Sequence, residues 1–202
     1  MSSDPSPFLR HLEHCNSATL PGGRAPFSLA GQPSGWITPE LFDRLEGAGL
    51  GTRAQGFNLP EPERLEALGQ ALAAEGFYRS HHELFDVMPD LGKPVMGRID
   101  RGALPLFGLV AVGVHMNGLV PTPHGLHLWV GRRAAHKRLH PAPPAHLVAG
   151  AVPAGHTPLQ ALAKEAAAEP SIVPHLLAPP APTGRTVHSP IPQDAPQRHI
   201  TL

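Results

Sequence analysis

The chain has 202 residues, enough for one domain with an appendage or for two small domains that each bury a core. Its 16 Lys plus Arg residues balance its 16 Asp plus Glu residues, so no global charge favours nucleic acid or an anionic membrane surface as the partner. The single cysteine excludes an internal disulfide, and the longest apolar run, residues 104–114, is too short to cross a bilayer. The polar N-terminus lacks the basic start and apolar stretch of a secretory signal, so we expect a soluble, cytoplasmic protein.

Two helices are predicted in the N-terminal part, which shows mixed helix and strand patterns from about residue 8 to 95. The first has Thr38 as its N-cap and Pro39 at its first helical position. The second covers residues 61–75 and ends at Gly76. Its apolar face comprises Leu65, Leu68 and Leu72. This helical spacing indicates an amphipathic helix that packs on a sheet.

Paired strands are predicted from Leu104 to Val130, where short apolar runs alternate with turn residues. The turn between them falls at Asn117–Gly118 or at Pro121–Gly125. The residues His81-His82-Glu83 stand among apolar neighbours that suggest a strand. From Pro174 to Pro196, seven prolines disfavour continuous helix or strand over most of the segment.

The residues best suited to chemistry lie between Gly150 and Ile172. Thr157, Pro158 and Gln160 form a capping-box pattern, which predicts a short helix over about residues 158–169. The expected apolar face of this helix is Leu159, Leu162 and Ala166.

Two carboxylates follow on the same helix. Glu165 and Glu169 are four residues apart, so both project from one helix face. Such a pair suits a hard cation such as Mg²⁺, whose remaining positions water and substrate phosphates complete. A solvated helix face is the alternative, and the spacing alone does not separate the two interpretations.

The segment resembles the Nudix box, whose pattern is Gly, five residues, Glu, seven residues, Arg-Glu, an apolar residue, one residue, Glu-Glu, one residue, Gly and an apolar residue. The matching positions are Gly150, Glu165, Glu169 and Ile172. Lys164 and Ala166 are weaker versions of the Arg and of the large apolar residue. The departures are His156, Ala168 and Ser171, which stand where the pattern has Glu, Glu and Gly.

The flanking sequence resembles a Nudix subfamily related to the N-terminal part of fungal thiamine pyrophosphokinases. The segments that carry this resemblance are FGLVAVGVHMNGLV, LHLWVGRR and HLVAGAV, and FLRHLEHCN, GWITPELFDRL and FYRSHHELFDV resemble the subfamily's accessory N-terminal domain. The resemblance implies an α+β fold, with a small accessory α/β domain over residues 1–103 and a Nudix-type α/β/α sandwich with a mixed sheet over residues 104–202. After RHITL the chain stops before the remaining strands of that fold, so we expect a truncated domain or an uncovered sheet edge.

The same resemblance implies hydrolysis of thiamine diphosphate, and of oxidised or damaged forms of it, to the monophosphate with Mg²⁺ or Mn²⁺. Glu165 and Glu169 would be the metal ligands, and one of them could take the proton from the attacking water. Lys164 would replace the Arg that orients the neighbouring Glu. Gly150 would let the backbone approach phosphate or metal, although a simple tight turn explains a glycine equally well.

Several alternatives stay open. Because Ala168 removes one carboxylate, the chain could instead be a catalytically impaired relative that binds a ligand or associates, as in a homodimer. Arg132 and Arg133 suit the oxygens of a small diphosphate, or they form a solvated strand end. The pairs His124 with His127 and His136 with His140 could bind a transition metal but have no accompanying Cys or carboxylate. Trp36 and Trp129 are expected to be packing residues and not stacking platforms.

Overall fold

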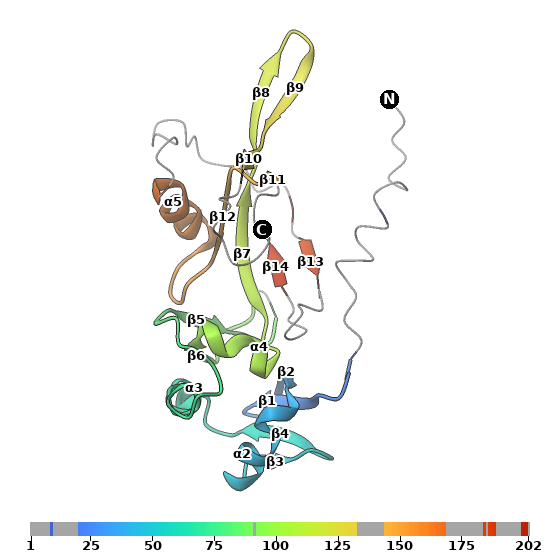
Figure 1. Cartoon of the computed structure of the whole chain (residues 1–202), viewed down its shortest axis with the longest axis vertical. Coiled ribbons are helices and arrows are strands. Elements are labelled where there is room, and N and C mark those ends of the chain that lie inside the picture. The colour runs from blue at the N-terminus through green and yellow to red at the C-terminus, as the bar shows by residue number, and fades with distance from the viewer. Residues whose placement is uncertain are drawn as a thin grey trace. The chain divides into compact units, whose positions relative to one another are not determined.

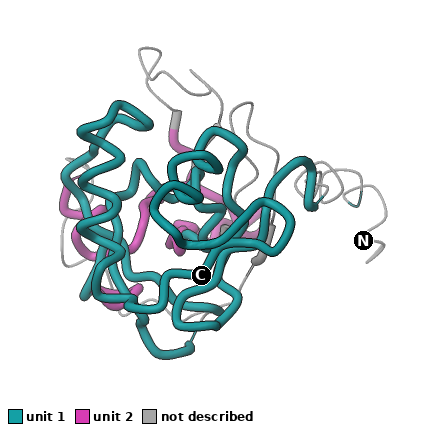
Figure 2. Tube along the Cα trace, turned by 90° about the horizontal axis from the view of Figure 1, so that it is seen from below, with its two compact units in different colours: residues 1–111, 153–155, 186–200 teal, residues 112–152, 156–185, 201–202 magenta. Residues whose placement is uncertain are grey.

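The structure is a computed structural model, and it describes residues 9, 20–90, 92–132, 144–168, 184, 186–188 and 199–201. These residues fall into two compact units, which Figure 2 colours separately. The first unit comprises residues 1–111, 153–155 and 186–200, and the second comprises residues 112–152, 156–185 and 201–202. The architecture is mixed α/β, as the sequence predicts. The domain division after residue 103 stays a prediction.

The first unit contains a four-stranded mixed sheet. Its strands are β1 (Ala25–Leu29), β2 (Gln32–Ile37), β3 (Gly51–Thr52) and β4 (Gly56–Leu59), in the order β2-β1-β4-β3. β1 pairs antiparallel with β2 and parallel with β4, and β3 pairs antiparallel with β4. Alternate residues of β1 are buried, so one face of this sheet carries the core.

Both helices predicted in this unit are present. The turn η1 (Pro39–Leu41) runs into α2 (Phe42–Gly47), and η2 (Pro62–Arg64) runs into α3 (Leu65–Ala74). Thr38 occupies the N-cap position, but its hydroxyl makes no capping hydrogen bond. The helix α3 buries Leu65 and Leu72 fully, and Gly76 follows its end with a φ of +85°. This positive φ is why a glycine stands there.

A two-stranded antiparallel ribbon follows, formed by β5 (Leu84–Val87) and β6 (Gly97–Asp100). The expectation of a strand over residues 81–83 is wrong, because β5 begins only at Leu84. The amides of His81 and His82 donate instead to the Asp100 carboxylate, and His82 has a φ of +55°, which an extended strand does not allow.

The first predicted strand does not start at Leu104, as expected, but at Ala111. Residues 101–107 form η3 (Arg101–Ala103) and α4 (Leu104–Phe107), which ends at Gly108 with a φ of +58°. The Asp100 side chain caps this turn by accepting the Gly102 N–H at 2.7 Å. Asp100 before the turn and Gly108 after it were the signals for a helix in the sequence.

The second unit is built on the antiparallel pair β7 (Ala111–Met116) and β12 (Val148–Ala151), which Figure 1 shows side by side with α5 (Pro158–Ala168). Its core consists of Val114, Val148, Ala161, Leu162 and Ala166. Leu159 was expected on the apolar face of α5, but it is 57% exposed and Ala161 takes its place in the core. Leu162 and Ala166 are buried as predicted, so only the Leu159 position of the expected apolar face is wrong.

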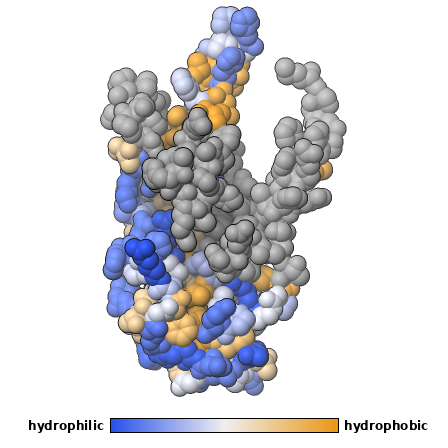
Figure 3. Space-filling view, viewed as in Figure 1, coloured by the Kyte–Doolittle hydropathy of each residue, from blue (hydrophilic) through white to orange (hydrophobic). Residues whose placement is uncertain are grey.

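An exposed hairpin follows β7. Its strands are β8 (Gly118–Thr122) and β9 (Gly125–Trp129), so the turn lies within residues 121–125, and Asn117 precedes β8. Trp129 is 62% exposed, which contradicts its expected packing role. Figure 3 shows apolar side chains of this hairpin at the surface.

Four short strands complete the described elements. They are β10 (Gly131–Arg132), β11 (Pro144–Ala145), β13 (Thr186–His188) and β14 (His199–Thr201). β10 pairs antiparallel with β11. β14 lies within the RHITL segment, whereas most of the proline-rich segment lies outside the described residues. In the described part of the chain, no helix has the length and apolar character that spanning a membrane requires.

Candidate functional site

The start of α5 is fixed by the capping box that the sequence predicts. The Thr157 N–H donates to Gln160 Oε1 at 2.8 Å, and the Gln160 N–H donates to Thr157 Oγ1 at 3.2 Å. These reciprocal hydrogen bonds satisfy amides that the first turn of a helix leaves without partners. They determine where the helix begins.

Glu165 lies on a partly buried face of α5, directly over Gly150 of β12. A Cβ atom built on Gly150 would collide with the Cγ and carboxyl carbon of Glu165 and would lie 2.9 Å from its Oε1. Gly150 is inside a strand, where it pairs with Val114, and it has no positive φ. The glycine is therefore required by the close approach of the Glu165 side chain, and a tight turn does not explain it.

The other predicted site residues are not gathered in the same way. Lys164 is exposed, and Ala168 is exposed at the last position of α5. The backbone of Arg132 pairs with Pro144, and its side chain is outside the description. Glu169 and Arg133 lie outside the described residues. The structure thus brings together Gly150 and Glu165, and the roles of the rest stay predictions.

No group of three or more His, Cys, Asp or Glu residues suited to a metal ion occurs among the residues that the structure describes. His124 and His127 are both exposed, in the hairpin turn and in β9, and His136 with His140 falls outside the described part. A different histidine pair does form. The rings of His115 and His146 stack at 4.2 Å, and His146 Nδ1 lies 3.1 Å from Asn117 Oδ1. Nothing in the local sequence pairs residues so far apart.

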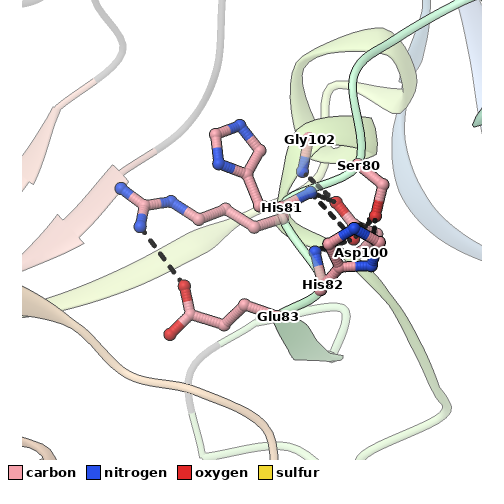
Figure 4. Close-up of polar contacts among 7 residues, drawn as sticks. Ser80, His81, His82, Glu83, Asp100 and Gly102 are labelled. Carbon is pink, nitrogen blue, oxygen red and sulfur yellow. Dashed lines mark hydrogen bonds and ion pairs between the residues drawn. The ribbon is translucent and has the colours of Figure 1, made fainter.

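The densest polar cluster described surrounds Asp100 (Figure 4). Its carboxylate accepts the Ser80 hydroxyl at 2.7 Å and the N–H groups of Gly102, His81 and His82 at 2.7 to 3.2 Å. Burial alone would raise the pKa of Asp100, but the hydrogen bonds from Ser80 and from the three amides outweigh it and lower the pKa.

The Asp100 cluster contains Ser, His and Asp, but it does not form a nucleophilic triad. In a triad, the imidazole lies between the hydroxyl and the carboxylate. Here the Ser80 hydroxyl donates directly to Asp100 and accepts the backbone N–H of His82. A cavity of about 500 Å³ lies beside the cluster. Because these groups hydrogen-bond to one another, the cluster holds the loop before β5 in place.

The chain is similar in sequence to known plant proteins. No family model matches it. It is 30% identical over 186 residues to the Arabidopsis thaliana protein named Nudix hydrolase 24, chloroplastic, an alignment that covers 85% of this chain and 51% of the relative. It is also 30% identical over 175 residues to Nudix hydrolase 20, chloroplastic, of the same plant, covering 76% of this chain and 47% of that relative. This similarity supports an assignment of the chain to the Nudix family.

The chain spans about half the length of the curated Nudix relatives that it matches. Two positions of the segment that resembles the Nudix box, Gly150 and Glu165, are in direct contact. The names of both relatives include the word chloroplastic, so they do not support a cytoplasmic location, which stays a prediction.

Proposed function

We propose that this chain is part of a Nudix hydrolase that cleaves a phosphoanhydride bond with Mg²⁺ or Mn²⁺. The observation that carries the proposal is the seating of the Glu165 carboxylate over Gly150, at two positions of the box. The similarity to two Nudix hydrolases supports hydrolysis of pyrophosphate bonds in general.

The donor chemistry fits a hard divalent cation, because carboxylate oxygens are the ligands that Mg²⁺ takes from proteins. Glu165 would supply one such ligand, and Glu169, four residues further in the sequence, would supply a second. A bound cation would neutralise the diphosphate and activate a water. One of the two carboxylates would accept the proton of that water. Lys164 would add a positive charge beside Glu165, without the planar fork of an Arg.

For the substrate, we propose thiamine diphosphate or its oxidised analogues, which would be cut to the monophosphate. The support is the resemblance of the flanking sequence to the subfamily described above. Arg132 and Arg133 would bind the diphosphate oxygens, since guanidinium groups pair with them in a bidentate manner. We further propose a small-molecule substrate in a cytoplasmic, homodimeric protein that binds neither nucleic acid nor membrane.

A second candidate function is association or ligand binding without catalysis. Ala168 favours it, because this exposed position at the end of α5 lacks the carboxylate that the box pattern has there. Fewer carboxylates bind fewer cations, and more weakly.

One assay separates the two functions. We would measure phosphate release from thiamine diphosphate and from its oxo analogue, with Mg²⁺ or Mn²⁺, for the unmodified chain and for the Glu165→Gln, Glu169→Gln and Ala168→Glu variants. We expect metal-dependent turnover, a loss on the order of 100-fold in kcat for each Gln variant, and a gain for Ala168→Glu. Glu63→Gln, which changes an exposed carboxylate outside the box, is the control and should leave turnover unchanged.

The hydrolase proposal is wrong if neither the unmodified chain nor Ala168→Glu shows metal-dependent turnover. A dimer seen by analytical ultracentrifugation would then favour association as the function.

A further inference from the structure

We propose that Asp86 is a positioning residue for the candidate site, because it holds the loop that joins β12 to α5. This inference rests on the proposed hydrolase function. Nothing in the Nudix box pattern includes Asp86, which lies in β5, 69 residues before its partner in the loop.

The loop residues 153–155 belong to the same compact unit as the β5–β6 ribbon. Two loop amides donate to β5. The Gly155 N–H donates to Asp86 Oδ2 at 2.7 Å, and the Ala154 N–H donates to the carbonyl oxygen of Leu84 at 2.8 Å. The loop is thus fastened at consecutive residues by a strand far away in the sequence.

Asp86 is itself held in place. Arg98 is its cross-strand partner in β6, and Arg98 Nε donates to Asp86 Oδ1 at 3.0 Å. Each carboxylate oxygen therefore has its own donor, Arg98 on one side and Gly155 on the other. The Asp86 side chain is only 16% exposed, whereas that of Arg98 is 52% exposed. A hydrogen bond from an amide to a partly buried carboxylate is stronger than one between neutral groups.

The conformation of Gly155 aims its N–H at Asp86. Its φ is +75°, in the left-handed region that other residues rarely adopt, and a Cβ there would contact only the Arg98 guanidinium, at 3.8 Å. A glycine is therefore required because of this backbone conformation, and not because a side chain would lack space. The loop conformation and the Asp86 contact depend on each other.

The anchored loop constrains the position of Glu165. The loop connects Gly150 of β12, through residues 151–156, to the Thr157 cap that starts α5. Because Glu165 must fit against Gly150, the length and path of the loop determine whether its carboxylate reaches that position. Displacements of about 1 Å in a catalytic group reduce rates by about 100-fold. Asp86 thereby acts through Glu165 and need not touch substrate.

The test compares Asp86→Ala with Asp86→Asn, which keeps an oxygen acceptor for Gly155 but loses the charge. The matched control is Glu83→Ala, which removes the Glu83–Arg101 ion pair of 3.2 Å at the other end of the same ribbon (Figure 4). We expect Asp86→Ala to lower kcat about 10-fold and to raise the Mg²⁺ concentration for half-maximal activity, with little change in the KM for thiamine diphosphate. Asp86→Asn should recover most of the loss, and Glu83→Ala should match the unmodified chain.

Two readouts do not need turnover. Hydrogen exchange of the peptide over residues 153–157 should accelerate in Asp86→Ala and not in Glu83→Ala, and Mn²⁺ affinity measured by electron paramagnetic resonance should fall in the same variant only. Unchanged exchange or unchanged Mn²⁺ affinity in Asp86→Ala would overturn the proposal. A chain that lacks all turnover but shows both changes would overturn the hydrolase function and leave the positioning role standing.

Discussion

At the residue scale, the contact between Gly150 and Glu165 makes a direct prediction. Gly150→Ala places a methyl group where the Glu165 side chain lies, so the carboxylate or the helix must move. We expect a loss of about 1–3 kcal/mol in the free energy of unfolding, as for other overpacked sites, measured by urea denaturation.

The control for Gly150→Ala is Gly47→Ala. Gly47 is the last residue of α2, no atom lies within 4 Å of a Cβ built there, and its φ is not positive. Removing backbone freedom at such a position is expected to stabilise the chain by about 0.4–1 kcal/mol. Equal urea midpoints for the two variants would contradict the contact.

A second residue-scale prediction concerns Tyr78, the single tyrosine of the chain. Its hydroxyl donates to the Gly69 carbonyl oxygen at 2.9 Å, and burial, together with the nearby Asp100 charge, raises its pKa to about 12. The phenolate absorbance should therefore appear near pH 12 after a rapid pH jump of the native chain, and near pH 10 in denaturant.

The sign of the stability effect follows from the same shift. Because the folded pKa of Tyr78 is above the unfolded value, its contribution to stability is complete below about pH 10 and is lost as pH rises through about 12. The slope of the unfolding free energy over this range should flatten in Tyr78→Phe. A native absorbance midpoint near pH 10 would show that the phenol is solvated.

At the element scale, α5 depends on its capping box. Thr157→Ala removes the hydroxyl that accepts the Gln160 N–H, and we expect a loss of about 1 kcal/mol in unfolding free energy. Thr157→Ser keeps the hydroxyl and should retain most of that stability. Thermal unfolding followed by circular dichroism would measure both variants, and similar midpoints for them would show that the cap contributes little.

The position and buried face of a helix are predicted from the sequence better for some helices than for others. Residues 61–75 are predicted as a helix because three leucines recur at helical spacing and Gly76 can end it, and both signals are local. In α5, Leu162 and Ala166 are predicted correctly as core residues, but Ala161 is missed because Leu159 is the larger apolar residue in the sequence. Ala161 is fully buried and Leu159 is 57% exposed, and this choice depends on how α5 packs on the rest of the core. The apolar residues 104–107 are compatible with either a strand or a helix. The Asp100 cap at the start of the preceding turn favours the helix.

At the scale of the whole molecule, two observations inform the function. The positive and negative side chains are equal in number, and the chain is similar to a Nudix hydrolase over about half of that relative's length. The hydrolase assay tests the molecule as a whole, because turnover requires every part of the site at once. If the chain is active, Glu165→Gln and Glu169→Gln should both abolish most of that activity. If it is inactive, Ala168→Glu shows whether one lost carboxylate is the cause.

Features that depend on neighbouring residues can be predicted from the sequence: the helix over residues 61–75, the capping box, and the resemblance of the segment that contains Gly150 and Glu165. The sequence could not show that Glu165 rests on Gly150 or that Asp86 binds the loop at Gly155. These contacts join residues 15 and 69 positions apart. Periodicity and capping act over one or two helical turns, whereas such contacts exist only after strands and helices have packed, and so only the tertiary structure decided them.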